Sequence, residues 1–410
     1  MRNYSEKDRT DKLVSLCVAL QVTLLGCKNV LVQGVPFLYD VNDKLNVIIL
    51  GLITPLYIYS FFIIKARAIS REAKFFWKFI LLTIIVNPLL FPMNIPLISS
   101  IALRGIVVLL MTCYLLSKLN TLVHIQHYML LGTYVMTASC ILFVFLMNSI
   151  GHTTGSDWST YSMPMSNVAM WAIMWQLHAY FKQGNKWALF AALICFAVLF
   201  SYGARNCLLA IAAYLLIFFF YKVRRGRTNT SQVLFLCSVA FFVVCAVFWH
   251  TILVATAAFL DNMGISGRAI YTLLDSDDID DLTTGRSAIH DRLIQLIWEH
   301  PLLGMGICGD EANMGELAHS LYLNIFSTWG IIFGSVFFLA LIRWTILGLK
   351  SAKGLGHELL VLLMCMVYPR GFSGGDIWVS DVFWWMMGII FMILSNSIRT
   401  KRYAKYSYNG

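Results

Sequence analysis

Long apolar segments follow one another through almost the whole chain, and each is about as long as a lipid bilayer is thick. Crossing ~30 Å of hydrocarbon takes about 20 apolar residues in a helix. Only 13% of the 410 residues are charged and 59% are hydrophobic, whereas about 25% of a soluble domain is charged. No segment alternates with a period of two, and lipid requires every backbone polar group to be satisfied internally. The sequence therefore predicts an all-α polytopic membrane protein.

Twelve segments are candidate transmembrane helices. No internal repeat and no stretch with the composition of a soluble domain interrupts them, so residues 1–410 are predicted to form a single integral membrane domain. The charged N-terminus has no small-residue cleavage site after its apolar segment, and we expect a retained cytoplasmic tail. The segments cover approximately residues 13–33, 45–64, 75–92, 97–117, 128–148, 165–181, 187–204, 206–221, 233–253, 320–346, 358–368 and 382–398.

Basic residues gather in short clusters between the apolar segments. In a twelve-helix arrangement, the clusters hold 22 of the 31 lysines and arginines and fall on one side, which the positive-inside rule assigns to the cytoplasm. This predicts two cytoplasmic termini and accounts for the net charge of +10 without nucleic acid as a partner. The clusters are Arg2/Lys7/Arg9/Lys12, Lys65/Arg67/Arg71/Lys74, Lys118, Lys182/Lys186, Lys222/Arg224/Arg225/Arg227, Arg343/Lys350/Lys353 and Arg399/Lys401/Arg402/Lys405.

Residues 254–317 form a long polar loop between the ninth and tenth helices. They hold 11 of the 21 carboxylates, and the same alternation of sides places them outside the cytoplasm. From Arg286 to Glu299 apolar residues recur at helical spacing, and Pro301 ends the pattern. We expect a short amphipathic helix that lies along the membrane surface or covers a cavity. The acidic run at 275–281 is interpreted as a solvated loop.

Arginines outside the basic clusters are the most informative residues of the chain. Arg104 lies about two turns inside the fourth segment, where a charge costs roughly 2.5–3.5 kcal/mol on insertion scales and marks a functional candidate. Arg205 follows the seventh segment, Arg286 opens the amphipathic helix, and Arg370 lies at the external end of the eleventh segment. A guanidinium binds phosphate through two parallel hydrogen bonds and stays charged when desolvated. A lipid-linked diphosphate is the expected ligand, and structural ion pairs with carboxylates such as Asp376 are the alternative.

His319 heads the tenth segment, directly after the long loop. It is a candidate general base because the pKa of histidine lies near neutral pH; an interfacial histidine that only forms hydrogen bonds is the alternative. The turn from His300 to Gly306 (His-Pro-Leu-Leu-Gly-Met-Gly) precedes it, and its glycines allow a sharp bend or the close approach of a ligand. The ten cysteines show no metal-ligand spacing, so no metal and no cofactor are predicted.

Together these motifs resemble the O-antigen polymerase and O-antigen ligase superfamily. The resemblance is sharpest over residues 201–208 and 266–376. It implies a fold similar to the membrane-embedded, lipid-phosphate-dependent glycosyltransferases (GT-C-like), and an inverting, metal-independent glycosyltransferase reaction. The motifs are Ser201-x-x-x-Arg205, Gly285-Arg286, the His300-Pro-Leu-Leu-Gly-x-Gly turn, His319 and Arg370-Gly-Phe.

The resemblance also implies roles for individual residues. Arg205 and Arg286 would hold the diphosphate of the donor, and Arg370 matches an arginine in the last external turn. His319 would deprotonate the hydroxyl of the acceptor sugar. Arg104 joins the diphosphate-binding set from its position in the membrane. Family members commonly have asparagine after the histidine; here Ser320 follows, and its hydroxyl can still orient the ring.

The interpretation that follows is a polymerase of O-antigen or a related surface polysaccharide. It would join undecaprenyl-diphosphate-linked repeat units at the periplasmic face of the bacterial inner membrane. The segment Gly306-Ile-Cys-Gly-Asp310, close before Ala-His-Ser, resembles polymerases more than ligases. Alternatives are a ligase that transfers the glycan to lipid A–core and a transporter or flippase of lipid-linked sugars. The expected partners are the lipid-linked glycan donor and acceptor, membrane lipids and a chain-length regulator protein.

Overall fold

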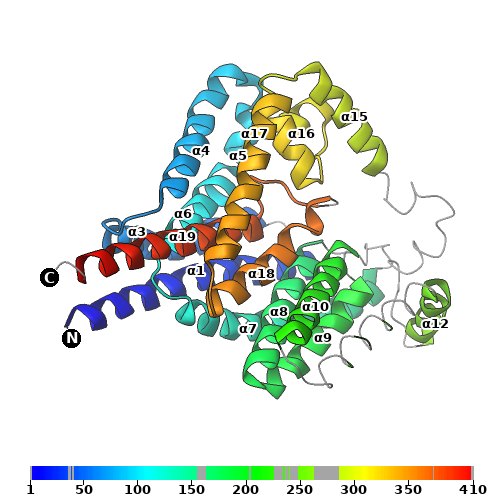
Figure 1. Cartoon of the computed structure of the whole chain (residues 1–410). Helices are drawn as coiled ribbons and strands as arrows, with labels where there is room; N and C mark the ends of the chain where they lie inside the picture. The colour runs from blue at the N-terminus through cyan, green and yellow to red at the C-terminus, as the bar shows by residue number, and fades with distance from the viewer. Residues whose placement is uncertain are drawn as a thin grey trace. The chain divides into compact units, whose positions relative to one another are not determined.

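The computed structural model describes most of the chain as helices joined by short connections (Figure 1). The described residues are 2–35, 38, 41–154, 163–202, 205–225, 233, 236, 240, 248–262, 286–372 and 374–407. No strand occurs among them. Eleven of the twelve predicted segments coincide with helices, and the remaining one, at 233–253, lies largely outside the described residues.

The helices have the following bounds. The α-helices are α1 (Arg2–Gly34), α3 (Asn42–Ile64), α4 (Arg71–Leu90), α5 (Ile95–Ile101), α6 (Val108–Ser117), α7 (Val123–Thr154), α8 (Met163–Gln183), α9 (Lys186–Tyr202), α10 (Arg205–Arg225), α12 (Trp249–Asn262), α15 (Arg286–Glu299), α16 (Gly309–Met314), α17 (Leu321–Ser351), α18 (Leu355–Val367) and α19 (Asp381–Ser407). Two 3₁₀ turns, η1 (Pro92–Asn94) and η3 (Arg370–Phe372), and one π-helical turn, η2 (Ala102–Val107), complete the set.

Six of the described helices are long and apolar enough to cross a membrane, and a bent pair at 92–117 raises the number to seven. Three shorter apolar helices lie within α9, α10 and α19. The outward side chains suit lipid: Leu52 on α3 is 66% exposed, and Leu89 on α4 is 78% exposed. The prediction of a polytopic helical membrane protein is confirmed in this coarse form, and the number twelve stays a prediction.

The chain divides into two compact units. The first comprises Met1–Val22, Asn46–Tyr128 and Arg286–Gly410, and the second comprises Thr23–Leu45 and Met129–Gly285. In the second unit α8 packs against α9 and α10. Its Gln176 side chain is fully buried and donates to Thr133 O and Thr137 Oγ1 on α7, at 3.2 and 2.8 Å. A buried amide needs such partners because its desolvation is otherwise uncompensated.

The core of the first unit is built around α19. Phe383 and Trp384 are fully buried, and Gly388 lets α6 approach closely, since a Cβ there would lie 3.0 Å from Cys113 O. Phe76 of α4 packs edge-to-face on Trp384 and on Trp344 of α17. The helices α4, α6, α17 and α19 therefore share one aromatic core.

Two polar ends terminate this helix bundle. At one end the Ser70 N–H, before α4, donates to Ser395 Oγ of α19, and Asn396 Nδ2 donates to Asn120 O after α6. At the other end Asn87, in the last turn of α4, accepts from Ile307 N–H. An α-helix of 20 residues such as α4 is about 30 Å long, which matches the thickness of the hydrocarbon layer. One membrane thickness thus separates the two ends.

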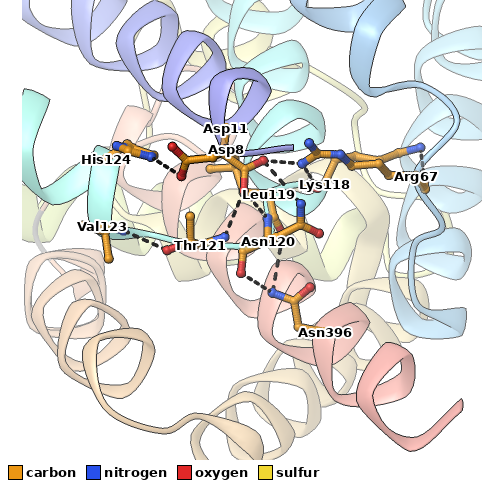
Figure 2. A network of polar contacts seen from close by, with 10 residues as sticks. All are labelled: Asp8, Asp11, Arg67, Lys118, Leu119, Asn120, Thr121, Val123, His124 and Asn396. Carbon is orange, nitrogen blue, oxygen red and sulfur yellow. Dashed lines mark hydrogen bonds and ion pairs between the residues drawn. The ribbon is translucent and has the colours of Figure 1, made fainter. Parts of the chain in front are cut away.

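The end at residues 8–11, 65–70, 118–124 and 396 is a dense charged network (Figure 2). The buried Asp11 carboxylate pairs with Arg67 and accepts from the N–H groups of Asn120 and Thr121 at 3.1 and 3.2 Å. Lys118 Nζ donates to the carbonyls of Lys65 and Arg67. We call this the basic end, because it gathers residues of the predicted cytoplasmic clusters.

Candidate active site

The turn at 300–309 docks into a break in α17. Gly330 has φ 72° and ψ 179°, a conformation essentially restricted to glycine, and it interrupts the helix there. The break frees a carbonyl and an N–H group of the helix for the turn: Met305 N–H donates to Ser327 O at 2.7 Å, and Ile331 N–H donates to Pro301 O at 2.7 Å. A Cβ on Gly330 would lie 2.7 Å from Gly304 N, so both backbones need glycine at this contact.

The other side of the same turn is held by α4 and η1. Asn94 Nδ2 donates to Met305 O and Ile307 O at 2.8 and 3.0 Å, and Asn87 Oδ1 accepts from Ile307 N–H at 3.1 Å. A Cβ on Gly306 would lie 2.5 Å from the Phe91 ring. The Gly-x-Gly glycines identified in the sequence are thus used for protein packing in this structure.

The amphipathic segment at 286–299 is helix α15, and its apolar face packs on protein. Leu293 and Ile297 are buried against Met305 and Ala318. Trp298 on the opposite side is 70% exposed, which suits an aromatic residue at a membrane interface. The placement of this helix outside the cytoplasm stays a prediction.

The residue before His319 is held at both of its backbone groups. Ala318 N–H donates to Asp310 Oδ2 at 2.8 Å, and Ala318 O lies 3.1 Å from His290 Nε2 on α15. His319 itself has φ 48°, in the left-handed region, which only a few per cent of non-glycine residues adopt. Because His290 lies one turn after Arg286, the start of α15 is tied to the backbone beside His319.

The segment that carries Arg370 is hydrogen-bonded to the first turns of α17. Ser320 caps α17 by accepting from Leu323 N–H, and its hydroxyl donates to Gly371 O at 3.1 Å. Tyr322 OH donates to Tyr368 O at 2.9 Å. His319 and Arg370 therefore lie on neighbouring stretches of backbone. The hydroxyl of Ser320 makes one of these links.

Asn324 joins the same elements from the buried side. Its Nδ2 donates to Asp310 Oδ2 at 3.4 Å, and its Oδ1 accepts from Ile377 N–H at 3.2 Å. Asp376, beside Ile377, accepts from Trp378 N–H at 2.7 Å. Burial and the neighbouring carboxylate of Asp310 raise the pKa of Asp376 to about 7, although the hydrogen bond from Trp378 opposes the shift.

Arg104 lies in the π-helical turn η2, at the 67° bend between Pro92–Ile101 and Gly105–Ser117. A Cβ on the adjacent Gly105 would lie 2.9 Å from Val379 Cγ1 and 3.3 Å from Trp378 O. The backbone that carries Arg104 therefore touches the loop that follows Asp376. π-Helical turns occur frequently at functional sites.

The fold thus gathers the backbone segments of Arg104, Arg286, His319 and Arg370 at one end of the first unit. Arg205 begins α10 in the second unit. The side chains of Arg104, Arg205 and Arg286 lie outside the described part of the structure. Among the described residues, no group of three or more His, Cys, Asp or Glu residues is arranged to hold a metal ion.

Comparison with protein families gives one match. Residues 190–339 match the family model described as O-antigen ligase. This match supports the resemblance to the O-antigen ligase and polymerase superfamily and does not distinguish the two activities. The matched range contains Arg205, Arg286 and His319, whereas Arg104 and Arg370 lie outside it. No curated protein and no solved structure matches the chain, so the similarity to GT-C-like enzymes stays a prediction.

Proposed function

We propose that this protein is an inverting glycosyltransferase that polymerises undecaprenyl-diphosphate-linked repeat units into a surface polysaccharide. The match of residues 190–339 to the O-antigen ligase family model supports glycan transfer from a lipid carrier. The observation that carries the proposal is the pair of contacts around His319. His290 with Ala318 and Ser320 with Gly371 draw the arginine-bearing segments of α15 and η3 to the candidate base.

In this mechanism arginines supply the charge that a metal supplies elsewhere. Arg286 and Arg370, with Arg104 and Arg205, bind the donor diphosphate and offset the negative charge that grows on it as it leaves. His319 accepts the proton of the acceptor hydroxyl, whose oxygen attacks the anomeric carbon from the face opposite the diphosphate. The bond to the diphosphate breaks, undecaprenyl diphosphate leaves with the electron pair, and the anomeric configuration inverts.

The arrangement of the first unit supports an extracytoplasmic site. The candidate site and the basic end lie at opposite ends of α4, α6 and α19. Because the positive-inside rule assigns the basic end to the cytoplasm, the site faces the other side of the membrane in our proposal. A lipid-linked donor presented in the outer leaflet then reaches it directly.

Ligase activity is the second candidate function. The matching family model is described as O-antigen ligase, and a ligase differs only in its acceptor, lipid A–core. The short connection between Gly306-Ile-Cys-Gly-Asp310 and His319 favours the polymerase in our proposal.

Purified protein in liposomes, supplied with one undecaprenyl-diphosphate repeat unit and no other acceptor, tests the proposal. A ladder of lengthening glycans on the lipid supports the polymerase. Transfer that requires added lipid A–core would replace it with the ligase. Folded protein that transfers to neither acceptor would overturn both.

Two variants test the residue roles in that assay. Arg286→Ala and His319→Ala are expected to abolish the ladder without preventing membrane insertion. Arg292→Ala is the matched control, because Arg292 lies exposed on the same helix as Arg286. Full activity in both site variants would contradict the mechanism.

A further inference from the structure

Asn324 occupies a position between the two parts of the candidate site. Its side chain is fully buried on α17, one and a half turns after His319. Its two polar atoms point to different elements: the amide nitrogen donates to Asp310, and the amide oxygen accepts from the backbone of Ile377. A carboxamide is the side chain that can donate and accept in this way at once.

Asp310 connects Asn324 to the backbone beside the candidate base, His319. The same oxygen that accepts from Asn324 accepts from Ala318 N–H, directly before the left-handed His319. Asp310 is 1% exposed, and its second oxygen, Oδ1, makes no hydrogen bond within the described part of the chain. A buried carboxylate with an unused acceptor is costly, so packing alone does not account for it.

We propose that Asn324 is a positioning residue that fixes His319 relative to the loop carrying Arg370, acting through Asp310 on one side and Ile377 on the other. The inference rests on the proposed function, since it assigns His319 and Arg370 to one reaction. A general base must lie within hydrogen-bond reach of the proton that it removes, and small displacements lower the rate strongly. Asn324 contacts neither substrate nor reacting atoms in this scheme.

Variants at Asn324 and Asp310, alone and exchanged, test the inference. Asn324→Asp alone removes the donor to Asp310 and sets two carboxylates against each other. The exchanged pair, Asp310→Asn with Asn324→Asp, keeps one carboxylate and one carboxamide: the carboxamide oxygen at 310 accepts from Ala318 N–H, and the carboxylate at 324 accepts from Ile377 N–H. The bond between the two positions then requires the carboxamide nitrogen, which takes the place of Asp310 Oδ1, to turn toward position 324. Asn324→Ala removes both bonds without adding a charge. Gln295→Glu is the control for an added carboxylate, because Gln295 is exposed on α15.

The measurement is the rate of ladder growth per folded molecule, with kcat and KM separated. Asn324→Asp and Asn324→Ala are expected to lower kcat at least tenfold with KM for the lipid donor within twofold, and the exchanged pair is expected to recover at least a third of kcat. Wild-type kcat in Asn324→Ala or in Asn324→Asp would overturn the inference. A fully active His319→Ala protein would overturn the assignment of His319 as the base, whereas folded wild-type protein that transfers to neither acceptor would overturn the proposed function itself.

Discussion

The two polar ends of the first unit use similar residues but balance their charges differently. At the basic end the Asp11 carboxylate pairs with Arg67 (Figure 2). Lys118 Nζ donates to the backbone carbonyls of Lys65 and Arg67. At the site end, burial and then the neighbouring carboxylate of Asp310 raise the pKa of Asp376. The basic end therefore holds compensated charges, and the site end holds charges that repel.

Backbone strain follows the same division. Among the described residues, the non-glycine residues with positive φ are Cys308 and His319, and both lie at the site end. Backbone strain and pairs of like charges lower the stability of the folded state, and they cluster at functional sites. We infer that the basic end stabilises the fold, whereas the site end holds a particular geometry at a cost in stability.

The largest expected effect is on the rate of glycan transfer, which should fall for a variant at the site end and not for one at the basic end. His319→Ala should lower the rate of glycan transfer about 10²- to 10⁴-fold, because a general base contributes roughly that factor. Asp11→Ala should leave the rate per folded molecule within about twofold. Initial rates in liposomes, normalised to folded protein, check both. Equal losses in the two variants would remove the distinction between the ends.

A variant at the basic end should instead lower the stability of the fold. Asp11→Ala removes one partner of a buried pair and should lower the free energy of unfolding by about 3 kcal/mol, at the low end of such losses, because Arg67 stays 15% exposed. Asp8→Ala is the matched control, since Asp8 is 53% exposed in its contact with His124, and its effect should be small. Thermal unfolding in detergent measures both; a similar shift in the two variants would contradict the role of Asp11.

The break in α17 should tolerate no side chain. Gly330→Ala places a Cβ 2.7 Å from Gly304 N and Pro301 O and forces a glycine-only conformation, which costs about 1–3 kcal/mol before the clash is counted. Gly315→Ala is the control: its φ is 75°, but a Cβ there meets no atom within 4 Å. We expect Gly330→Ala to lose Tm and activity together, and Gly315→Ala to lose only the roughly 1–2 kcal/mol of the left-handed conformation, with activity retained. Comparable Tm values would show that the break does not hold the turn.

The stability of the site end should depend on pH. The pKa of Asp376 is raised from 3.8 to about 7 in the folded protein, so the folded state binds this proton more tightly than the unfolded state. Its contribution is therefore greatest below about pH 4, falls as the pH rises and levels off above about pH 7. Besides Asp310, the buried Asp376 faces Glu311. Asp376→Asn should flatten the dependence of Tm on pH in this window, whereas Asp8→Asn should not; an unchanged slope in Asp376→Asn would exclude this carboxyl as its source.

The smallest effect concerns the residue after His319. Ser320→Ala removes the N-cap of α17 and the bond to Gly371 O, and should cost about 1 kcal/mol. Ser320→Asn, which installs the residue common in the family, should stay near wild type because asparagine is also a favourable cap. Tm and transfer rate measured together check the pair. A larger loss in Ser320→Asn than in Ser320→Ala would show that the hydroxyl has a different role.

Several residues of the candidate site could be singled out from the sequence, and their roles stay predictions. Arg104, Arg370 and His319 were identified because a charge or a titratable group beside an apolar segment conflicts with lipid, and that conflict is visible in one dimension. The glycines of the 300–306 turn were also visible. Their role in packing was not visible, because it depends on Gly330, Asn87 and Phe91, which come from distant parts of the chain.

What the sequence determined by itself is the helical, polytopic class of the protein and the arginines and histidine that break its apolar pattern, because the cost of exposing backbone or charge to lipid acts on each segment separately. The tertiary structure alone decided that Asp310, Asn324 and Ile377 meet behind His319. Hydrogen bonds between residues 14 and 53 positions apart leave no periodic trace in a sequence. They form only when packed helices bring those residues to the same end of the bundle.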